Sequence, residues 1–195
     1  MAFLKTMPDA DLKRAFRMQP DISVPMLEYH EALLRGPSPF TVGERELIAA
    51  YTSGLNNCDF CYDEHGAVAE AFGISEGLLA PLMEDLDTAD ISDRMRLVLR
   101  FVGKLTNTPA RMVQADADAV FGAGWDDIAV YHAVSVCALF AHDNRMVQGL
   151  GIPAQDATSL STTVDRLHDG GYASTARYVR GEVDESGAAV PDQKS

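Results

Sequence analysis

Apolar residues recur at helical spacing along most of this sequence, and no convincing run of alternating β-branched residues appears. Capping residues, glycines and prolines divide the periodic stretches into pieces of helical length. The pattern therefore predicts an all-α fold, a multi-helix bundle. The expected helices cover residues 9–18, 24–34, 41–55, 58–72, 75–87, 92–107, 113–121 and 126–148, with one more short helix at the Ser/Thr run 158–163.

The clearest local unit is a pair of helices in the first half of the chain. Thr41 followed by Glu44 has the spacing of a capping box, which begins a helix. Residues 56–57 form a short break, and a second helix runs from about Cys58 to a stop at Gly73. Because helices joined by so short a turn pack roughly antiparallel, the sequence predicts a central helical hairpin.

Length and composition indicate one folded unit with a loose end. The chain has 195 residues, 47% of them hydrophobic and 23% charged, which are ordinary values for a globular protein with one core. No linker or low-complexity segment divides it. Its last stretch is polar and rich in small residues. We therefore expect a single domain over residues 1–180 and a flexible C-terminal tail over residues 181–195.

Charge and cysteine content narrow the environment and the partners. The formal net charge of −13 repels phosphate backbones, so nucleic acid is not an expected partner. No stretch reaches the roughly 18 apolar residues of a membrane span, and the first residues carry no secretory signal pattern. The three cysteines, an odd number, favour a reducing compartment over a secreted disulfide framework. We expect a cytoplasmic protein with no membrane partner.

Cys58, Cys61 and His65 form the constellation most suited to chemistry. On a helix the two cysteines are three residues apart and neighbours on one face, and His65 lies one turn further along that face. The cysteines fall in the first turn, where unpaired N–H groups and the helix dipole favour a thiolate. Peroxide reduction needs a thiolate, a group that moves a proton and a second thiol to resolve the sulfenic acid. This spacing supplies all three.

The preceding helix offers a carboxylate partner for His65. Residue numbers that face each other across an antiparallel turn at 56–57 sum to about 113, which places Glu46 within about a turn of the histidine. Glu44 lies about 200° round the same helix and should point away. Glu46 is therefore the predicted group that fixes the imidazole tautomer and accepts its proton. The acidic pair Asp63-Glu64, next to the histidine, is predicted to lie on a solvated face.

These residues carry a resemblance to a known family. Glu46 and the motif Cys58-x-x-Cys61-x-x-x-His65, after a helix rich in small residues, resemble the alkylhydroperoxidase D family of the carboxymuconolactone decarboxylase superfamily. The stretch 138–151, Ala-Leu-Phe-Ala-His-Asp-Asn-Arg-Met-Val-Gln-Gly-Leu-Gly, also looks like the ending that the peroxidase-related branch places after its last core helix.

The resemblance covers roughly residues 20–153 and implies roles for the site residues. By this likeness Cys61 is the peroxidatic cysteine, Cys58 the resolving one, and Glu46 and His65 the proton relay. The family implies an all-α fold, no bound prosthetic group or metal, and electrons from a dithiol protein or a small thiol. It also implies a homo-oligomer. Because a helical protein with such a hairpin and exposed apolar faces usually self-associates, we expect a dimer or a higher assembly such as a hexamer. The expected function is thiol-dependent hydroperoxide reduction in antioxidant defence.

Three other interpretations stay open. A Cys58–Cys61 disulfide could serve a non-enzymatic redox sensor or adaptor instead of a peroxidase. A carboxymuconolactone decarboxylase-like activity is disfavoured, because decarboxylases of the superfamily lack the cysteine pair. Structural zinc needs four ligands, and the candidates weighed for the remaining sulfur and nitrogen ligands, Cys137 and His132, both fall on a long apolar helix.

Overall fold

The structure is a computed structural model that describes residues 1–190. Within them it contains α-helices, one 3-10 turn and no named strand, which confirms the predicted all-α class. None of the described helices is both long and apolar enough to cross a membrane. The elements are α1 (Leu12–Phe16), α2 (Pro20–Leu34), α3 (Val42–Leu55), α4 (Asp59–Ala71), α5 (Leu79–Glu84), α6 (Asp93–Asn107), η1 (Pro109–Arg111), α7 (Gln114–Gly122), α8 (Asp127–Leu150) and α9 (Ala157–Arg180).

The hairpin of α3 and α4 forms for the local reasons that the sequence indicates. The hydroxyl of Thr41 accepts a hydrogen bond from the Glu44 N–H (3.1 Å), and the Glu44 carboxylate accepts one from the Thr41 N–H (2.8 Å). At the turn Asn57 adopts a φ of 53°, a left-handed conformation that asparagine tolerates. The Cys58 N–H then donates to the Ser53 carbonyl (3.0 Å) and Cys58 becomes the N-cap of α4.

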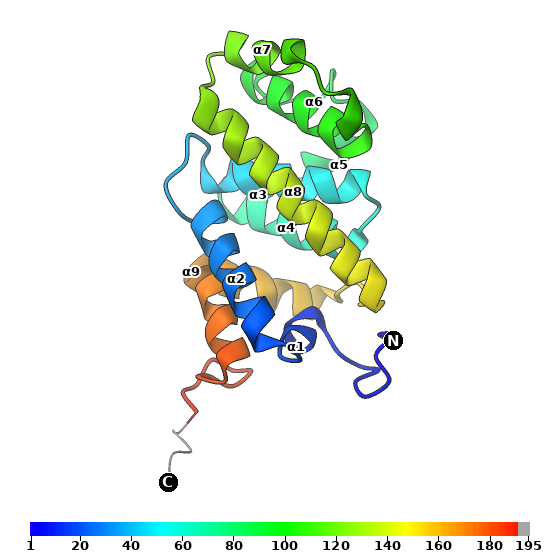
Figure 1. Cartoon of the computed structure of the whole chain (residues 1–195), viewed down its shortest axis with the longest axis vertical. Helices are drawn as coiled ribbons and strands as arrows, with labels where there is room; N and C mark the ends of the chain where they lie inside the picture. The colour runs from blue at the N-terminus through cyan, green and yellow to red at the C-terminus, as the bar shows by residue number, and fades with distance from the viewer. Residues whose placement is uncertain (191–195) are drawn as a thin grey trace.

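The other helices pack around this hairpin at two ends (Figure 1). Helix α8 crosses α3 and α4 diagonally, α6 and α7 lie at one end, and α2 and α9 pack together at the other. The core lies between α3, α4, α6 and α8, and burying each of its large side chains stabilises the fold by about 1.5–3 kcal/mol. Its fully enclosed members, at most 1% exposed, include Leu47, Ile48, Val68, Leu99 and Phe140.

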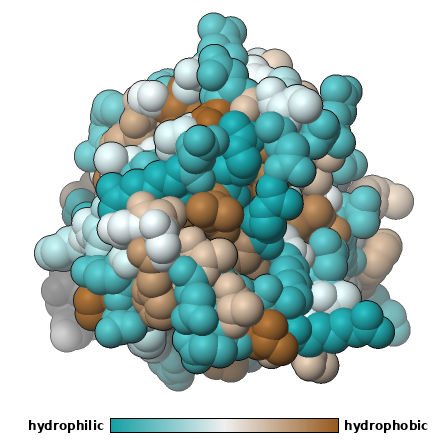
Figure 2. Space-filling model, turned by 90° about the horizontal axis from the view of Figure 1, so that it is seen from above, coloured by the Kyte–Doolittle hydropathy of each residue, from teal (hydrophilic) through white to brown (hydrophobic). Residues whose placement is uncertain are grey.

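The surface at the α6–α7 end is mostly hydrophilic, with hydrophobic residues as separate spots (Figure 2). Scattered exposed apolar residues of this kind are normal for a folded domain. They single out no patch at this end of the molecule.

Helix α9 is much longer than the short helix expected near 158–163. It runs over Ala157–Arg180 with a break at Gly171, where φ is 56° and ψ is −163°. The Glu31 carboxylate of α2 accepts the N–H groups of Tyr172 (2.7 Å) and Ala173 (3.1 Å), and so caps the segment after the break. A Cβ at Gly171 would meet this carboxylate at 2.4 Å. Because the cap comes from a distant helix, the local sequence gives no N-cap signal for this segment.

The predicted flexible tail, residues 181–195, lies partly outside the described residues, which end at 190. In the described part, Val183 is 5% exposed, packs in a cluster with Phe16 and Leu27, and forms an isolated antiparallel bridge with Ala189.

Candidate active site

The two thiols of the motif lie at the start of α4, reduced and almost fully enclosed. Cys58 is the N-cap and Cys61 lies in the first turn, each 2% exposed. Hydrogen bonding from the Cys61 thiol lowers the pKa of Cys58 to about 7, against the opposing effect of burial. The same hydrogen bond, together with burial, raises the pKa of Cys61. The pair therefore releases one proton near neutrality and holds the second, as two sites that share a proton do.

The structure brings Glu46 and His65 into direct contact, at the position that the antiparallel arithmetic predicts. The Nδ1 atom of His65 lies 2.6 Å from Oε2 of Glu46. Glu46 is completely buried and His65 is 5% exposed. All four predicted residues therefore lie on one hairpin, with the acid on α3, the thiols at the start of α4 and the imidazole one turn further along it.

The buried acid remains ionised because it has cationic partners. Burial alone would raise the pKa of Glu46, but the charge and hydrogen bond of His65 and then of Arg35 hold it below the ordinary value. Burial likewise acts to lower the pKa of His65, but Glu46, together with the charges of Glu64 and Asp143, more than offsets it, and the imidazole pKa is raised. The pair is therefore a hydrogen-bonded acid and imidazole whose proton position depends on the charges around them.

Two further partners of Glu46 come from helices outside the hairpin. Nη1 of Arg35, the C-cap of α2, donates to Oε1 of Glu46 (2.5 Å), and the Tyr172 hydroxyl of α9 donates to the same oxygen (3.2 Å). The guanidinium lies 4.9 Å from the Phe72 ring centroid and 5.0 Å from that of Tyr172. Sequence reasoning missed both residues, because neither has a motif or a spacing that relates it to Glu46.

The prediction of a solvated acidic face is confirmed for Asp63, which is exposed, and is wrong for Glu64. Its side chain is only 13% exposed, and its Oε1 lies 3.9 Å from Nε2 of His65. Gln155 donates to its other oxygen (2.5 Å). Burial raises the pKa of Glu64 in spite of the nearby charges of His65 and Arg166. The loop before α9 encloses this carboxylate, and α4 alone could not have indicated that.

An amide from α8 fixes the turn that carries the thiols. The Ser53 hydroxyl donates its proton to the Ala49 carbonyl (2.8 Å), so its oxygen accepts from Nδ2 of Asn144 (2.9 Å). Asn56 donates to the amide oxygen of Asn144 (2.9 Å). The Asn144 amide also acts to lower the pKa of both thiols. Asn144 is 1% exposed, and it lies in the 138–151 stretch that resembles the family ending.

A second histidine–carboxylate pair lies beside the first. Nε2 of His30 lies 2.6 Å from Oδ2 of Asp143, and its Nδ1 faces the Met26 carbonyl at 2.8 Å. Burial acts to raise the pKa of Asp143, but the charge of His30 and hydrogen bonds from His142 and His30 lower it to about 2. The rings of His30 and His65 both approach Phe140 edge-on, with centroids 6.3 and 4.4 Å away.

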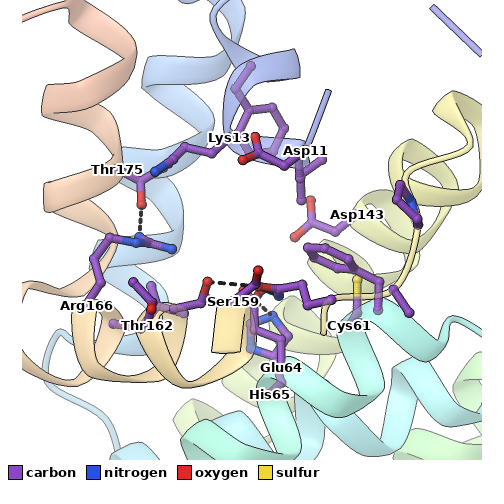
Figure 3. Close-up of a pocket in the computed structure, with 18 of the residues that line it drawn as sticks. Asp11, Lys13, Cys61, Glu64, His65, Asp143, Ser159, Thr162, Arg166 and Thr175 are labelled. Atoms are coloured by element: carbon purple, nitrogen blue, oxygen red, sulfur yellow. Dashed lines mark hydrogen bonds and ion pairs between the residues drawn. The ribbon is translucent and has the colours of Figure 1, made fainter. Parts of the chain in front are cut away.

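A cavity of about 500 Å³ opens over the motif (Figure 3). Cys61 and Asp143 lie on one side of the opening, and Arg166 and Thr175 on the opposite side. Cys61 lines the cavity, whereas Cys58 is not among its lining residues. The volume suits a small organic molecule. The walls combine apolar side chains with polar ones, among them Leu12, Phe16, Leu27, Phe60, Glu64, His65, Ser159, Thr162 and Leu167.

The remaining sulfur lies elsewhere. Cys137 on α8 is buried, and its thiol hydrogen-bonds to the Thr106 hydroxyl (3.3 Å). Over residues 1–190, no three His, Cys, Asp or Glu side chains are grouped closely enough to hold a metal ion.

Fold and site together define an all-helical protein with a buried dithiol, an imidazole and a carboxylate on one helical hairpin. An alkylhydroperoxidase AhpD core structure from Ralstonia eutropha JMP134, described as an uncharacterized peroxidase-related protein, superposes with a TM-score of 0.69 and 28% identity over 73% of this chain and 75% of that one. An uncharacterized peroxidase-related protein from Silicibacter sp. TM1040 gives a TM-score of 0.69 at 24% identity, over 74% of this chain and 75% of that one, which shows the shared fold.

These neighbours confirm the resemblance that the sequence indicates, to the alkylhydroperoxidase D-like proteins and their peroxidase-related branch. No family model matches the sequence, and no curated protein does.

Proposed function

We propose that this protein reduces hydroperoxides with its own dithiol, Cys61 acting as the peroxidatic and Cys58 as the resolving cysteine. The observation that carries the proposal is a thiol, Cys61, that lines a cavity while a hydrogen-bonded His65–Glu46 pair lies one helical turn away. Placing a nucleophile beside an oriented base is the general requirement for nucleophilic catalysis.

The first half-reaction consumes the peroxide. The Cys61 proton passes to the neighbouring Cys58 sulfur or to His65, and the thiolate attacks the outer oxygen of the peroxide. A sulfur–oxygen bond forms, the O–O bond breaks, and the leaving alkoxide takes a proton to become an alcohol. Cys61 is oxidised to a sulfenic acid and the peroxide is reduced by two electrons.

The second half-reaction restores the thiols. The Cys58 sulfur attacks the Cys61 sulfenic acid, a disulfide forms, and water leaves. A dithiol reductant, protein or small molecule, then reduces the disulfide by exchange and is itself oxidised to a disulfide. The cycle needs no prosthetic group. We further propose that the chain works as a homo-oligomer in the cytoplasm, as expected from the sequence.

A peroxide-consumption assay with dithiothreitol as electron donor tests the proposal. Wild type should consume an organic hydroperoxide catalytically, and Cys61→Ser should lose turnover to the background rate. Cys58→Ser should allow about one oxidation per chain and then stop. Cys137→Ser, a buried cysteine outside the motif, is the matched control and should retain full turnover. Equal activity of Cys61→Ser and wild type would exclude the proposal.

A further inference from the structure

The buried Glu46 carboxylate is shared between two cationic groups. Its Oε1 accepts from Arg35 at 2.5 Å and its Oε2 faces Nδ1 of His65 at 2.6 Å. Because a guanidinium remains charged at any working pH, Arg35 alone already balances the carboxylate. With a neutral His65 the three groups have no net charge, and with a protonated His65 they carry one positive charge in a buried place.

Arg35 therefore competes with a protonated His65 for the negative charge of Glu46. A net charge in a buried site is costly, so the guanidinium acts against protonation of His65 while the carboxylate acts for it. We propose that Arg35 is a positioning residue that sets the pH at which His65 can take up a proton. The inference rests on the proposed function only in taking Cys61 as the source of that proton.

The other charged groups around the pair do not remove this effect. Glu31 of α2 acts on Arg35 with its negative charge, but its carboxylate accepts the N–H groups of Tyr172 and Ala173 and makes no hydrogen bond to the guanidinium. On the Glu46 side, the Tyr172 hydroxyl of α9 is a neutral donor, since burial and then the Glu46 charge raise its pKa well above the ordinary value. Arg45 of α3 adds a further positive charge, but its hydrogen bonds go to backbone carbonyls. No other charged group hydrogen-bonds to Glu46 within residues 1–190.

On the His65 side, two acids favour the protonated ring. Glu64 of α4 lies 3.9 Å from Nε2, and Asp143 of α8 acts at longer range. Asp143 is already paired with His30 at 2.6 Å. Arg166, across the cavity, acts to lower the pKa of Glu64 and so favours its ionised form. Arg35 is the only cation at hydrogen-bond distance from the described Glu46–His65 pair, so it is the group whose removal should matter most.

The position of Arg35 is fixed independently of its role at Glu46. Nη1 also donates to the Leu34 carbonyl (3.2 Å) and Nη2 to the Leu167 carbonyl (3.3 Å). The guanidinium also lies over the ring of Phe72 and over the ring of Tyr172. These contacts hold the guanidinium beside Glu46 whether or not the imidazole is protonated. The charge competition is therefore built into the resting site.

Replacing Arg35 by glutamine gives a test with a definite sign. Without the guanidinium, the carboxylate serves the imidazole alone, so protonated His65 is stabilised and its pKa rises. The acid-side inflection of kcat/KM should move upward by about 1 pH unit, in the range that one close charge produces. The His65 ring signal, assigned by its absence in His65→Gln and followed by NMR in labelled protein, should shift its midpoint in the same direction.

Two further variants separate charge from shape. Arg35→Lys keeps the cation and should hold both midpoints close to wild type. Arg96→Gln removes another partly buried arginine, which binds the carbonyls of Leu86, Ala89 and Ile91 far from the site, and should lower stability without moving either midpoint. If folded Arg35→Gln titrates like wild type, the inference is wrong.

A second pair of variants tests the inference if Arg35→Gln does not fold. The double variant Arg35→Gln, Glu46→Gln leaves no uncompensated buried charge, and His65 should titrate at a higher pH in it than in Glu46→Gln alone. An equal midpoint in the two would overturn the inference. The NMR midpoint needs no turnover, so a wild type without peroxidase activity would refute the proposed function while leaving this result to be judged on its own.

Discussion

Two carboxylates face the same imidazole from opposite sides, and they are held in opposite states. Glu46 meets Nδ1 of His65 at 2.6 Å and has a lowered pKa, whereas Glu64 lies 3.9 Å from Nε2 and has a raised one. Both are strongly desolvated. The difference is that Glu46 also holds Arg35 directly, while the only hydrogen-bond donor on Glu64 is the neutral amide of Gln155 within the described residues.

The comparison shows that partners, more than burial, decide what a buried acid can do. An acid kept ionised can orient an imidazole and stabilise its protonated form. An acid with a raised pKa can hold or release a proton nearer neutrality. The ionised Glu46 suits the role of a fixed partner of His65. Glu64 suits the role of an acid whose protonation changes with what enters the cavity.

The largest effect is expected from replacing Glu46, the ionised one of the two carboxylates. Glu46→Gln leaves the Arg35 guanidinium buried without its anion and should lower the free energy of unfolding by about 3–5 kcal/mol at neutral pH. Peroxidase kcat/KM should fall by about 100-fold or more, because the imidazole loses its orienting acid. Urea unfolding and steady-state kinetics measure the two effects. A near wild-type result in both would mean that Glu46 is only a packing residue.

Glu46→Gln should also change how the free energy of unfolding depends on pH under acidic conditions. Because the pKa of Glu46 is lowered in the folded state, its contribution is present above its ordinary pKa of 4.5 and is lost as pH falls through the folded value. The stability gap between wild type and Glu46→Gln should therefore narrow below about pH 4.5. Unfolding midpoints measured from pH 3 to 8 would show a constant gap if the carboxylate were not ionised.

Glu64→Gln is expected to act with the opposite sign. Its raised pKa means that the protonated form stabilises the fold below the ordinary value of 4.5, and that this contribution is lost as pH rises through the folded value. A glutamine cannot ionise, so the variant should become more stable relative to wild type with rising pH. Thermal midpoints over the same pH range test this. Parallel curves for the two proteins would contradict the account of Glu64.

Tyr172→Phe should give the smallest change. It removes one neutral hydrogen bond to Glu46 (3.2 Å) without altering any charge, so a loss of about 1 kcal/mol in stability and a few-fold in kcat/KM is expected. Tyr178→Phe is the matched control, since that buried tyrosine donates to Glu185 away from the relay. Its kinetics should equal those of wild type. Equal kinetic losses in both variants would show that Tyr172 acts only through packing.

The geometry of the hairpin could be predicted from the sequence because the interactions that fix it are local. Capping at Thr41 and the short turn at residues 56–57 fix the direction of α3 and α4, and the helical repeat then brings Glu46 to His65. The all-α class followed from the same periodicity. These features depend on spacings of fewer than about 30 residues, which a single sequence displays directly.

The rest of the site depends on how distant helices pack, and the spacing of residues in the sequence does not indicate this packing. Arg35 and Tyr172 are 137 positions apart, yet they meet on one oxygen of Glu46. Tyr172 reaches it because Glu31 caps the backbone after Gly171. Asn144 could have been suspected as a polar residue within an apolar helix, but its contact with Ser53 becomes visible only in three dimensions.

Counting free thiols tests the dithiol mechanism most directly. The reduced protein has three cysteines, and one equivalent of hydroperoxide should leave a single reactive thiol after denaturation. Peptide mapping should then place the disulfide between Cys58 and Cys61, with Cys137 free. Three remaining thiols, or a disulfide that includes Cys137, would contradict the account.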